Sequence, residues 1–504
     1  MNKRLKIMLI TPPYHSGVVE SAGVWMNLGF VTLAGALRER GHEVVLHDAM
    51  ARFDDHETIQ AEIERQRPDL VGLTGITASY LACVEVCRRA KEARPGLITV
   101  LGNTHASFMW EEVLNLHAEI DYVVRGEGEV TIAELADCLA AGDHPRKVQG
   151  IAYRDGGHPV TTGTRRLSSD LDALPAAWDL VDWPTYTYRP KAGSTLAVVS
   201  SSRGCAQACT FCSQRLFWEL SWRPRRAEAF VAELEMLRDR FGVNIAMLAD
   251  ETPTVDPERW ARILDLLIER EVGVELLLET RVDDILRDEA LLPRYKEAGI
   301  SHIYVGVEAA RQDTLDLYQK DTSVEQGRRA IELINQADIV SETSFVLGTP
   351  DETPESIRTT VELAKHFGPD MAFFLAITPW PYTQLWPELE PHLEVRDYAR
   401  FNLVEPVVKP EAMTLEEMHR ALKSAAHEFF ADKFVRLGEL SAFKREFLVK
   451  VAAILMNHSY LAGDMARLRG EMPDWVRKML EGLERENAHL AAPGHGGLPD
   501  GRGS

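Results

Sequence analysis

Three cysteines within eight residues constrain this chain more than any other part of its sequence. Cys205, Cys209 and Cys212 have the spacing Cys-x3-Cys-x2-Cys and directly follow an apolar stretch at 195–199. Thiolates are soft ligands that select iron–sulfur clusters or zinc over hard cations. A closed zinc site uses four protein ligands, and the sequence has no second CxxC. The spacing therefore favours a [4Fe–4S] cluster held at three corners, with its fourth iron open to a small molecule.

The other cysteines, Cys83, Cys87 and Cys138, are scattered, and we expect them to be buried, inert thiols. Six cysteines in 504 residues without a secretory leader argue against a disulfide scaffold. We therefore expect a reducing, cytoplasmic compartment, which also suits an oxygen-labile cluster. No apolar run approaches the ~18 residues of a membrane span, so we predict none.

The formal net charge is −21. Because proteins that bind nucleic acid broadly carry a basic field, we predict no nucleic-acid partner. A local basic and aromatic stretch at 217–226 follows the cluster loop and is either a substrate or cofactor contact or a solvated loop with buried rings. Trp218, Trp222 and Trp380 are candidates for stacking on a flat substrate, although aromatic side chains in such positions also serve packing.

Apolar strands alternate with amphipathic helices over residues 1–142, which predicts a doubly wound parallel sheet. Ligands of such sheets bind beyond the carboxyl ends of the strands. The expected strands are Ile7–Thr11, Val44–His47, Leu70–Gly75, Thr99–Leu101 and Tyr122–Val124. The expected helices are Leu28–Arg40, Glu57–Arg65, Tyr80–Ala93, Phe108–Leu116 and Thr131–Ala141.

The rest of the chain divides into four further segments. We expect a linker or cap at 143–194, a partial (β/α)6 barrel at 195–385, a helical region at 386–491 and a disordered tail at 492–504. The expected barrel strands are Thr195–Ser200, Ala246–Ala249, Val274–Leu278, Ile303–Val307, Thr343–Leu347 and Ala372–Ile377. Chemistry in such barrels occurs at the carboxyl-end mouth. The clearest helices near the C-terminus are Phe443–Ser459 and Trp475–Glu486.

The cysteine spacing resembles the signature of the radical S-adenosylmethionine (SAM) superfamily. The resemblance implies that the amino and carboxylate groups of SAM occupy the open iron, and that one electron splits SAM into methionine and a 5′-deoxyadenosyl radical. It also implies an external electron donor such as flavodoxin or ferredoxin. The residues expected to bind SAM are Phe211, Asp250, Glu251, Glu279, Arg281, Glu308 and Gly348.

The N-terminal half resembles the cobalamin-binding domain that precedes the barrel in one large subclass. The usual Asp-x-His-x-x-Gly motif is missing, because Pro13 and Val18 stand where its Asp and Gly would flank His15. We therefore expect cobalamin to bind without a lower histidine ligand. The residues expected to contact it are Tyr14, His15, Ser16, Gly17, Thr74, Gly75, Thr77, Gly102, Asn103, His105, Arg125, Gly126, Glu127 and Gly128.

Short motifs spread from Lys6 to Met413 resemble the oxygen-independent magnesium-protoporphyrin IX monomethyl ester cyclase family. They include Cys212-Ser213-Gln214, Ala249-Asp250-Glu251-Thr252-Pro253-Thr254, Thr378-Pro379-Trp380-Pro381 and Lys409-Pro410-Glu411-Ala412-Met413. That family builds the fifth ring of bacteriochlorophyll with SAM, a [4Fe–4S] cluster and cobalamin. The chain departs from the family in its C-terminal region, in the cluster-loop interior at 206–208, and at Asn103, where a glycine is usual.

Three functions remain open on this evidence. The first is oxidative cyclisation of a porphyrin side chain, which the length of the resemblance favours. The second is methyl transfer through cobalamin to an unactivated carbon, which consumes a second SAM. The third is a cobalamin- or redox-sensing module without turnover. For an enzyme, the expected partner is a small-molecule substrate, with a tetrapyrrole as the candidate.

Overall fold

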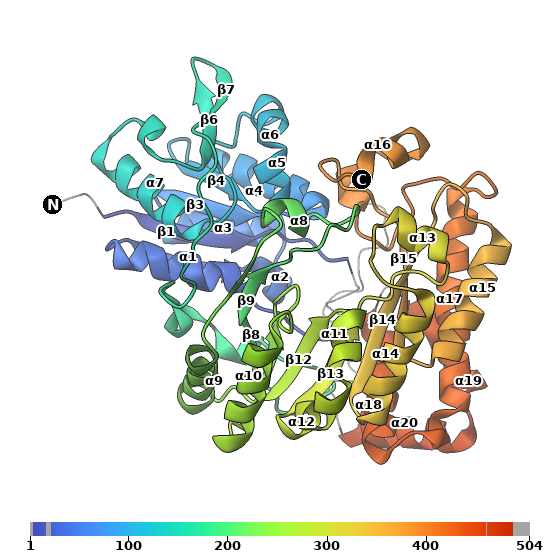
Figure 1. The fold of residues 1–504 in the computed structure, drawn as a ribbon. Coiled ribbons are helices and arrows are strands. Elements are labelled where there is room, and N and C mark those ends of the chain that lie inside the picture. The colour runs from blue at the N-terminus through green and yellow to red at the C-terminus, as the bar shows by residue number, and fades with distance from the viewer. Residues whose placement is uncertain (1–3, 17–21, 460, 487–504) are drawn as a thin grey trace.

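A computed structural model describes residues 4–16, 22–459 and 461–486. Two sheets lie side by side, each covered by helices: one built by the N-terminal third of the chain and one by the middle (Figure 1). Helices from the C-terminal part pack against the far edge of the second sheet (Figure 1). The predicted fold class is confirmed. Gly17 and the tail at 492–504 lie outside the described residues.

The first sheet has the strand order β2-β1-β3-β4-β5-β6-β7, and its first five strands are parallel. Its strands are β1 (Lys6–Thr11), β2 (Glu43–Asp48), β3 (Leu70–Thr74), β4 (Ile98–Gly102), β5 (Tyr122–Val124), β6 (Ile151–Asp155) and β7 (His158–Thr161). The central strands are apolar and buried on both faces, as a doubly wound sheet requires. Each face therefore carries its own hydrophobic core.

Helices α1 and α7 cover one face of this sheet, and α3 and α4 cover the other. The helices of this half are α1 (Leu28–Glu39), α2 (Ala49–Arg52), α3 (His56–Gln66), α4 (Tyr80–Ala93), α5 (Thr104–Phe108), α6 (Trp110–Leu116) and α7 (Glu129–Ala141). The single helix predicted at 108–116 is wrong in one respect. The structure forms two helices that meet at Met109, because Asn103 caps an earlier turn at Thr104.

The second sheet is parallel throughout and follows chain order, β8-β11-β12-β13-β14-β15, as a partial barrel does. Its strands are β8 (Leu196–Val199), β11 (Ile245–Leu248), β12 (Glu275–Thr280), β13 (Ile300–Val305), β14 (Val340–Leu347) and β15 (Met371–Ala376). A separate antiparallel pair, β9 (Ser202–Gly204) and β10 (Trp222–Pro224), brackets the cluster loop. The helices between these strands are α8 (Gln214–Phe217), α9 (Ala227–Phe241), α10 (Pro257–Glu269), α11 (Val282–Arg287), α12 (Leu292–Glu297), α13 (Gln312–Leu317), α14 (Val324–Gln336) and α15 (Pro354–Phe367).

The C-terminal region is helical, with one long helix that the sequence analysis did not identify. Helix α17 (Leu415–Val435) begins at a capping box between Thr414 and Glu417 and packs on α15 and β15. The remaining helices are α16 (Trp386–Leu389), α18 (Ala442–His458), α19 (Ala462–Glu471) and α20 (Asp474–Glu486). Among the described residues, no helix is both long enough and apolar enough to cross a membrane.

The segment expected as a linker or cap contributes to the first sheet. β6 and β7 form an antiparallel hairpin that extends the sheet beyond β5. Gly156 and Gly157 turn this hairpin with positive φ. The two strands are short and contain alternating polar residues, as loops do. The turn residues between them therefore led to the prediction of a linker.

Candidate functional site

The cluster loop begins directly after Gly204, the last residue of β9, at a position that fits only glycine. Gly204 has φ +95°, and a Cβ there would lie 2.1 Å from the carbonyl oxygen of Ser221. Its N–H donates to the Glu251 carboxylate at 2.9 Å. Pairing of β9 with β10 then holds the start of the loop against the residues that follow it. The loop is therefore anchored immediately before Cys205.

The three cysteines of the loop are free and half-buried. Burial raises the pKa of Cys212 to about 12 and that of Cys205 by less, whereas backbone N–H groups of Gln207 and Gln214 favour the two thiolates. Arg281 adds positive charge beside Cys205. Among the described residues, no three ligand side chains already converge on one point. Three soft donors on one loop with N–H groups directed at the sulfurs nevertheless fit a three-thiolate cluster site.

Carboxylates from three neighbouring strands gather at the barrel mouth. Glu251 follows β11, Glu279 lies in β12 and Glu308 follows β13. Burial, followed by repulsion from Glu251 and Glu308, raises the pKa of Glu279 to about 8. No described side chain forms an ion pair with Glu279. A cationic ligand, such as one carrying an ammonium and a sulfonium group, would offset this repulsion and favour the ionised form of Glu279.

Asp250 behaves differently from its neighbour Glu251. It is fully buried, and it accepts hydrogen bonds from the Ser201 N–H at 2.8 Å, the Ser201 hydroxyl at 2.7 Å and the Ser202 hydroxyl at 2.5 Å. Both carboxylate oxygens are therefore occupied by the turn between β8 and β9. Through these bonds Asp250 positions the segment that leads into the cluster loop.

The other residues expected to bind SAM lie around the same mouth. Arg281 donates to Asp283 at 2.8 Å, and Phe211 packs edge-on against Tyr318 at 5.1 Å. Gly348 follows β14 with φ +97°, and its N–H donates to Glu352 at 3.0 Å. The strand order brings these residues to one end of the barrel, as the sequence predicted.

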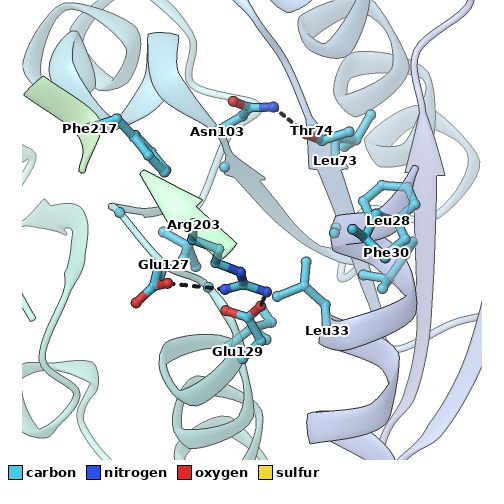
Figure 2. A pocket seen from close by; sticks show the side chains of 18 of the residues that line it. Leu28, Phe30, Leu33, Leu73, Thr74, Asn103, Glu127, Glu129, Arg203 and Phe217 are labelled. Atoms are coloured by element: carbon cyan, nitrogen blue, oxygen red, sulfur yellow. Dashed lines mark hydrogen bonds and ion pairs between the residues drawn. The ribbon is translucent and has the colours of Figure 1, made fainter. Parts of the chain in front are cut away.

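A cavity of about 310 Å³ opens where the carboxyl ends of the first sheet face the barrel (Figure 2). Leu28, Phe30 and Leu33 form its apolar wall. Arg203, Trp218 and Glu251 reach it from the second half, together with Phe217. The predicted cobalamin contacts that line it are Thr74, Gly102, Asn103, Gly126, Glu127 and Gly128. One cavity is thus shared by both halves, and its apolar wall with backbone-rich glycines fits part of a large cofactor.

Asn103 adopts a backbone conformation that glycine normally occupies. Its φ is +82° and its ψ is −176°, in a region that L-residues rarely enter. Its side-chain N–H donates to the Thr74 hydroxyl at 2.9 Å (Figure 2). Its side-chain oxygen Oδ1 accepts from the Thr104 N–H at 2.6 Å. The substitution for the glycine usual in the cyclase family thus keeps a glycine-like loop and holds it with side-chain hydrogen bonds.

Several predicted cobalamin contacts lie away from this cavity. Tyr14 donates to the carbonyl of Ala399 at 3.0 Å, and the His15 ring stacks on Phe53 with centroids 4.6 Å apart. Ser16, the next residue, is also outside the cavity lining. The Gly75 N–H donates to the Gly102 carbonyl at 3.3 Å. Arg125 donates to the Ser107 carbonyl at 3.1 Å, outside the cavity lining.

Thr77 and His105 face the segment that follows β15. The Thr77 hydroxyl lies 3.0 Å from the Tyr382 hydroxyl and 3.2 Å from Nδ1 of His105. His105 is fully buried and stacks on Tyr80 at 4.0 Å. Burial lowers the pKa of His105 to about 3, so this imidazole is neutral at physiological pH. These contacts join the first sheet to the barrel.

Four charged residues with largely buried side chains join the two halves more directly. We call Glu127, Glu129, Arg203 and Arg223 the interdomain ion cluster. Arg203 contacts Glu127 at 3.0 Å and Glu129 at 2.8 Å, and Arg223 contacts Glu127 at 3.0 Å (Figure 2 shows the Arg203 pairs). None of the four side chains is more than 15% exposed. Glu127, which is predicted to contact cobalamin and lines the cavity, also accepts hydrogen bonds from two guanidinium groups.

Sequence reasoning missed Glu129 and Arg223 as members of this cluster. Burial raises the pKa of Glu129, yet the charge and hydrogen bond of Arg203 outweigh that effect and leave the pKa below its ordinary value. The Thr32 hydroxyl also donates to Glu129 at 2.9 Å. The sequence does offer one indication of the cluster. The Arg-Gly-Glu-Gly-Glu run at 125–129 carries two glutamates, and arginines stand on both sides of the three cysteines.

Only one of the three candidate substrate tryptophans lines the cavity. Trp218 donates from its indole N–H to Glu251 at 2.5 Å. Trp222 donates to the Ser202 hydroxyl at 3.1 Å and to the Thr252 carbonyl at 3.0 Å, which commits it to the β9–β10 hairpin. Trp380 packs against a hydrophobic cluster beside the mouth.

Two known families match this chain, and the residues that they match correspond to its two sheets. The B12 binding domain family matches residues 14–136, and the Radical SAM superfamily matches residues 199–364. The anaerobic magnesium-protoporphyrin IX monomethyl ester cyclase of Rubrivivax gelatinosus is 37% identical over 85% of this chain and 78% of its own length. An uncharacterized methyltransferase of Pyrococcus horikoshii is 30% identical over 85% of this chain and 93% of its own length.

The fold also matches a solved structure. The radical SAM methyltransferase TsrM from Kitasatospora setae, with cobalamin and a [4Fe–4S] cluster bound, superposes with a TM-score of 0.69 at 17% identity. The match covers 96% of this chain and all of TsrM. At this identity the likeness establishes the arrangement of the two sheets.

The substitution Arg203→Met removes the positive charge that pairs with the Glu127 and Glu129 carboxylates. We expect a loss of about 3–5 kcal/mol of unfolding free energy, the usual cost of breaking a buried ion pair from one side. Denaturant unfolding of the cofactor-free protein measures it. The control is Arg38→Met, whose exposed pair with Asp179 should contribute about 1 kcal/mol or less. Equal losses in the two variants would contradict the importance of the cluster.

Glu279→Gln should flatten the pH dependence of stability. Because the pKa of Glu279 is raised from 4.5 to about 8, the folded protein binds this proton more tightly than the unfolded chain does. Stability therefore falls as pH rises through that window, by about 1.4 kcal/mol per pH unit. Thermal unfolding of the cofactor-free protein between pH 5 and pH 8 measures this dependence. The stability of the variant relative to the unmodified chain should be highest at the alkaline end. Parallel profiles would show that Glu279 ionises normally.

Proposed function

This chain belongs to the cobalamin-dependent radical SAM enzymes, and we propose that it oxidatively cyclises a side chain of a porphyrin substrate. The cofactors of this family are a [4Fe–4S] cluster, SAM and cobalamin. When bound, they supply a hydrogen-abstracting radical and a second redox-active centre. The observation that carries the assignment of joint cobalamin and radical chemistry is the cavity shared by the cobalamin-domain loops and the segment that leads into the cluster loop.

We assign the protein's own groups to distinct tasks. Cys205, Cys209 and Cys212 hold the cluster. Glu279 and Glu308 hold the cationic and ribose portions of SAM at the strand ends. The residues lining the shared cavity hold part of cobalamin, and Trp218 and Phe217 exclude water from its barrel side. Expulsion of water strengthens every electrostatic contact at the mouth.

The porphyrin assignment rests on sequence similarity. A relative 37% identical over 85% of this chain is named as a magnesium-protoporphyrin IX monomethyl ester cyclase. An external one-electron donor, such as flavodoxin or ferredoxin, is part of the proposal. The second candidate is cobalamin-dependent methyl transfer to carbon, which is supported by the methyltransferase name of the relative at 30% identity.

The two candidates consume SAM differently, so product analysis separates them. The protein is reconstituted without oxygen and supplied with SAM, cobalamin, a strong reductant and magnesium-protoporphyrin IX monomethyl ester. Mass spectrometry quantifies 5′-deoxyadenosine, S-adenosylhomocysteine and the pigment. We expect substrate-dependent 5′-deoxyadenosine without S-adenosylhomocysteine, together with a ring-closed pigment that carries oxygen from labelled water.

Other outcomes point elsewhere. A rise of both SAM products with a methylated pigment would support methyl transfer. If the ester changes neither SAM product, the porphyrin assignment is wrong. Cys209→Ala is the matched control for cluster-dependent chemistry, and Cys138→Ala, which alters a buried thiol in α7, should leave SAM cleavage intact.

A further inference from the structure

The loop between α13 and α14 contacts both the cluster loop and a strand-end carboxylate. We call residues 317–320 the brace. They comprise the last residue of α13 and the three residues after it, and they contact the cluster loop on one side and Glu308 after β13 on the other. No motif in the sequence marked this segment.

The first side of the brace holds the cluster loop between its second and third cysteines. The Thr210 N–H donates to the carbonyl of Tyr318 at 3.0 Å, and the Thr210 hydroxyl donates to the carbonyl of Leu317 at 2.9 Å. The ring of Phe211 packs edge-on against Tyr318 with centroids 5.1 Å apart. Thr210 and Tyr318 are both buried, so these bonds are shielded from water.

The second side of the brace holds Glu308. Lys320 donates from Nζ to the Glu308 carboxylate at 2.6 Å, and their side chains are 7% and 12% exposed. Gly306 completes the contact: a Cβ there would lie 2.5 Å from Glu308 Oε1 and 2.7 Å from Lys320 Nζ. A side chain at 306 would therefore push the carboxylate and the ammonium group out of these positions.

The backbone of Glu308 is constrained as well. Its φ is +65°, which is uncommon outside glycine. Its N–H donates to Ser344 at 3.1 Å, and its carbonyl accepts from Val346 at 2.8 Å, so the strained residue is held by the end of β14. Strained residues of this kind persist where the surroundings determine them, and they concentrate at functional sites.

A buried ion pair is costly to form and seldom the best way to stabilise a fold. At this position the pair has another use. Glu308 adds to the negative field that raises the pKa of Glu279, and Lys320 both offsets part of that field and fixes one Glu308 oxygen. The second oxygen accepts a long hydrogen bond from the Ser344 hydroxyl at 3.5 Å and keeps further acceptor capacity.

We propose that Lys320 is a positioning residue and that the brace couples the cluster loop to Glu308. If SAM binds with one end at the open iron and its ribose at the strand ends, these two anchoring points must stay at a fixed separation. The brace joins them through hydrogen bonds on one side and the ion pair on the other. This inference rests on the proposed function, because it assumes that SAM bridges the cluster and Glu308.

A double-mutant cycle on cluster-loaded protein tests the coupling. The variants are Lys320→Met, Lys320→Arg, Glu308→Gln and the Lys320→Met/Glu308→Gln pair. The readouts are the SAM dissociation constant from anaerobic calorimetry and the change that SAM causes in the electron paramagnetic resonance spectrum of the reduced cluster. Iron and sulfide content confirm that each variant is loaded. Lys365→Met removes an outer-helix lysine paired with Glu362 and Glu428 and serves as the control.

We expect Lys320→Met to weaken SAM binding about tenfold or more, the effect of losing one charge-assisted hydrogen bond. Lys320→Arg should restore part of the affinity, and Lys320→Met should add little in the Glu308→Gln background. Unchanged affinity in Lys320→Met, or fully additive losses in the pair, would overturn the inference. If the unmodified loaded protein fails to bind SAM, the proposed function fails instead, so the two failures are distinguishable.

Discussion

A buried cluster of two arginines and two glutamates determines how the halves of this enzyme meet. Arg203 lies two residues before the first cluster cysteine, and Glu127 and Glu129 lie in the loop and helix that follow β5. Charges removed from water stabilise a structure only when they are paired well. The geometry that satisfies both guanidinium groups therefore fixes the segment that leads into the cluster loop relative to the cobalamin domain, and residues of both line the same cavity.

The site also contains strained residues and a buried carboxyl group that forms no ion pair with any described residue. Asn103 and Glu308 hold backbone conformations that cost energy, and Glu279 is a carboxyl group whose pKa is raised to about 8. Each persists because its surroundings are rigid: the Thr74 hydrogen bond at Asn103, the Lys320 pair at Glu308, and the sheet at Glu279. Strain and excess negative charge are what a site must retain if a cationic cofactor is to be bound strongly when it arrives.

Much of this architecture could be predicted from the sequence, because strand hydrophobicity and the cysteine spacing are local signals. The eleven predicted strands all form, and the carboxylates at their ends meet because parallel strands end at one edge. The roles of Asp250 and Glu127 could not be predicted, since they depend on partners about 50 to 100 residues away, Ser201 and Ser202 for one and Arg203 and Arg223 for the other. The β6–β7 hairpin was missed because its turn glycines resemble a linker.

We expect the interdomain ion cluster to hold the cobalamin and iron–sulfur sites in one rigid frame. Pulsed electron paramagnetic resonance on protein loaded with cob(II)alamin and the reduced cluster measures the dipolar coupling between the two paramagnets. The account predicts one narrow distance distribution that is the same with and without SAM. A broad or multiple distribution in the unmodified protein would show that the two halves move independently, and it would contradict the claim.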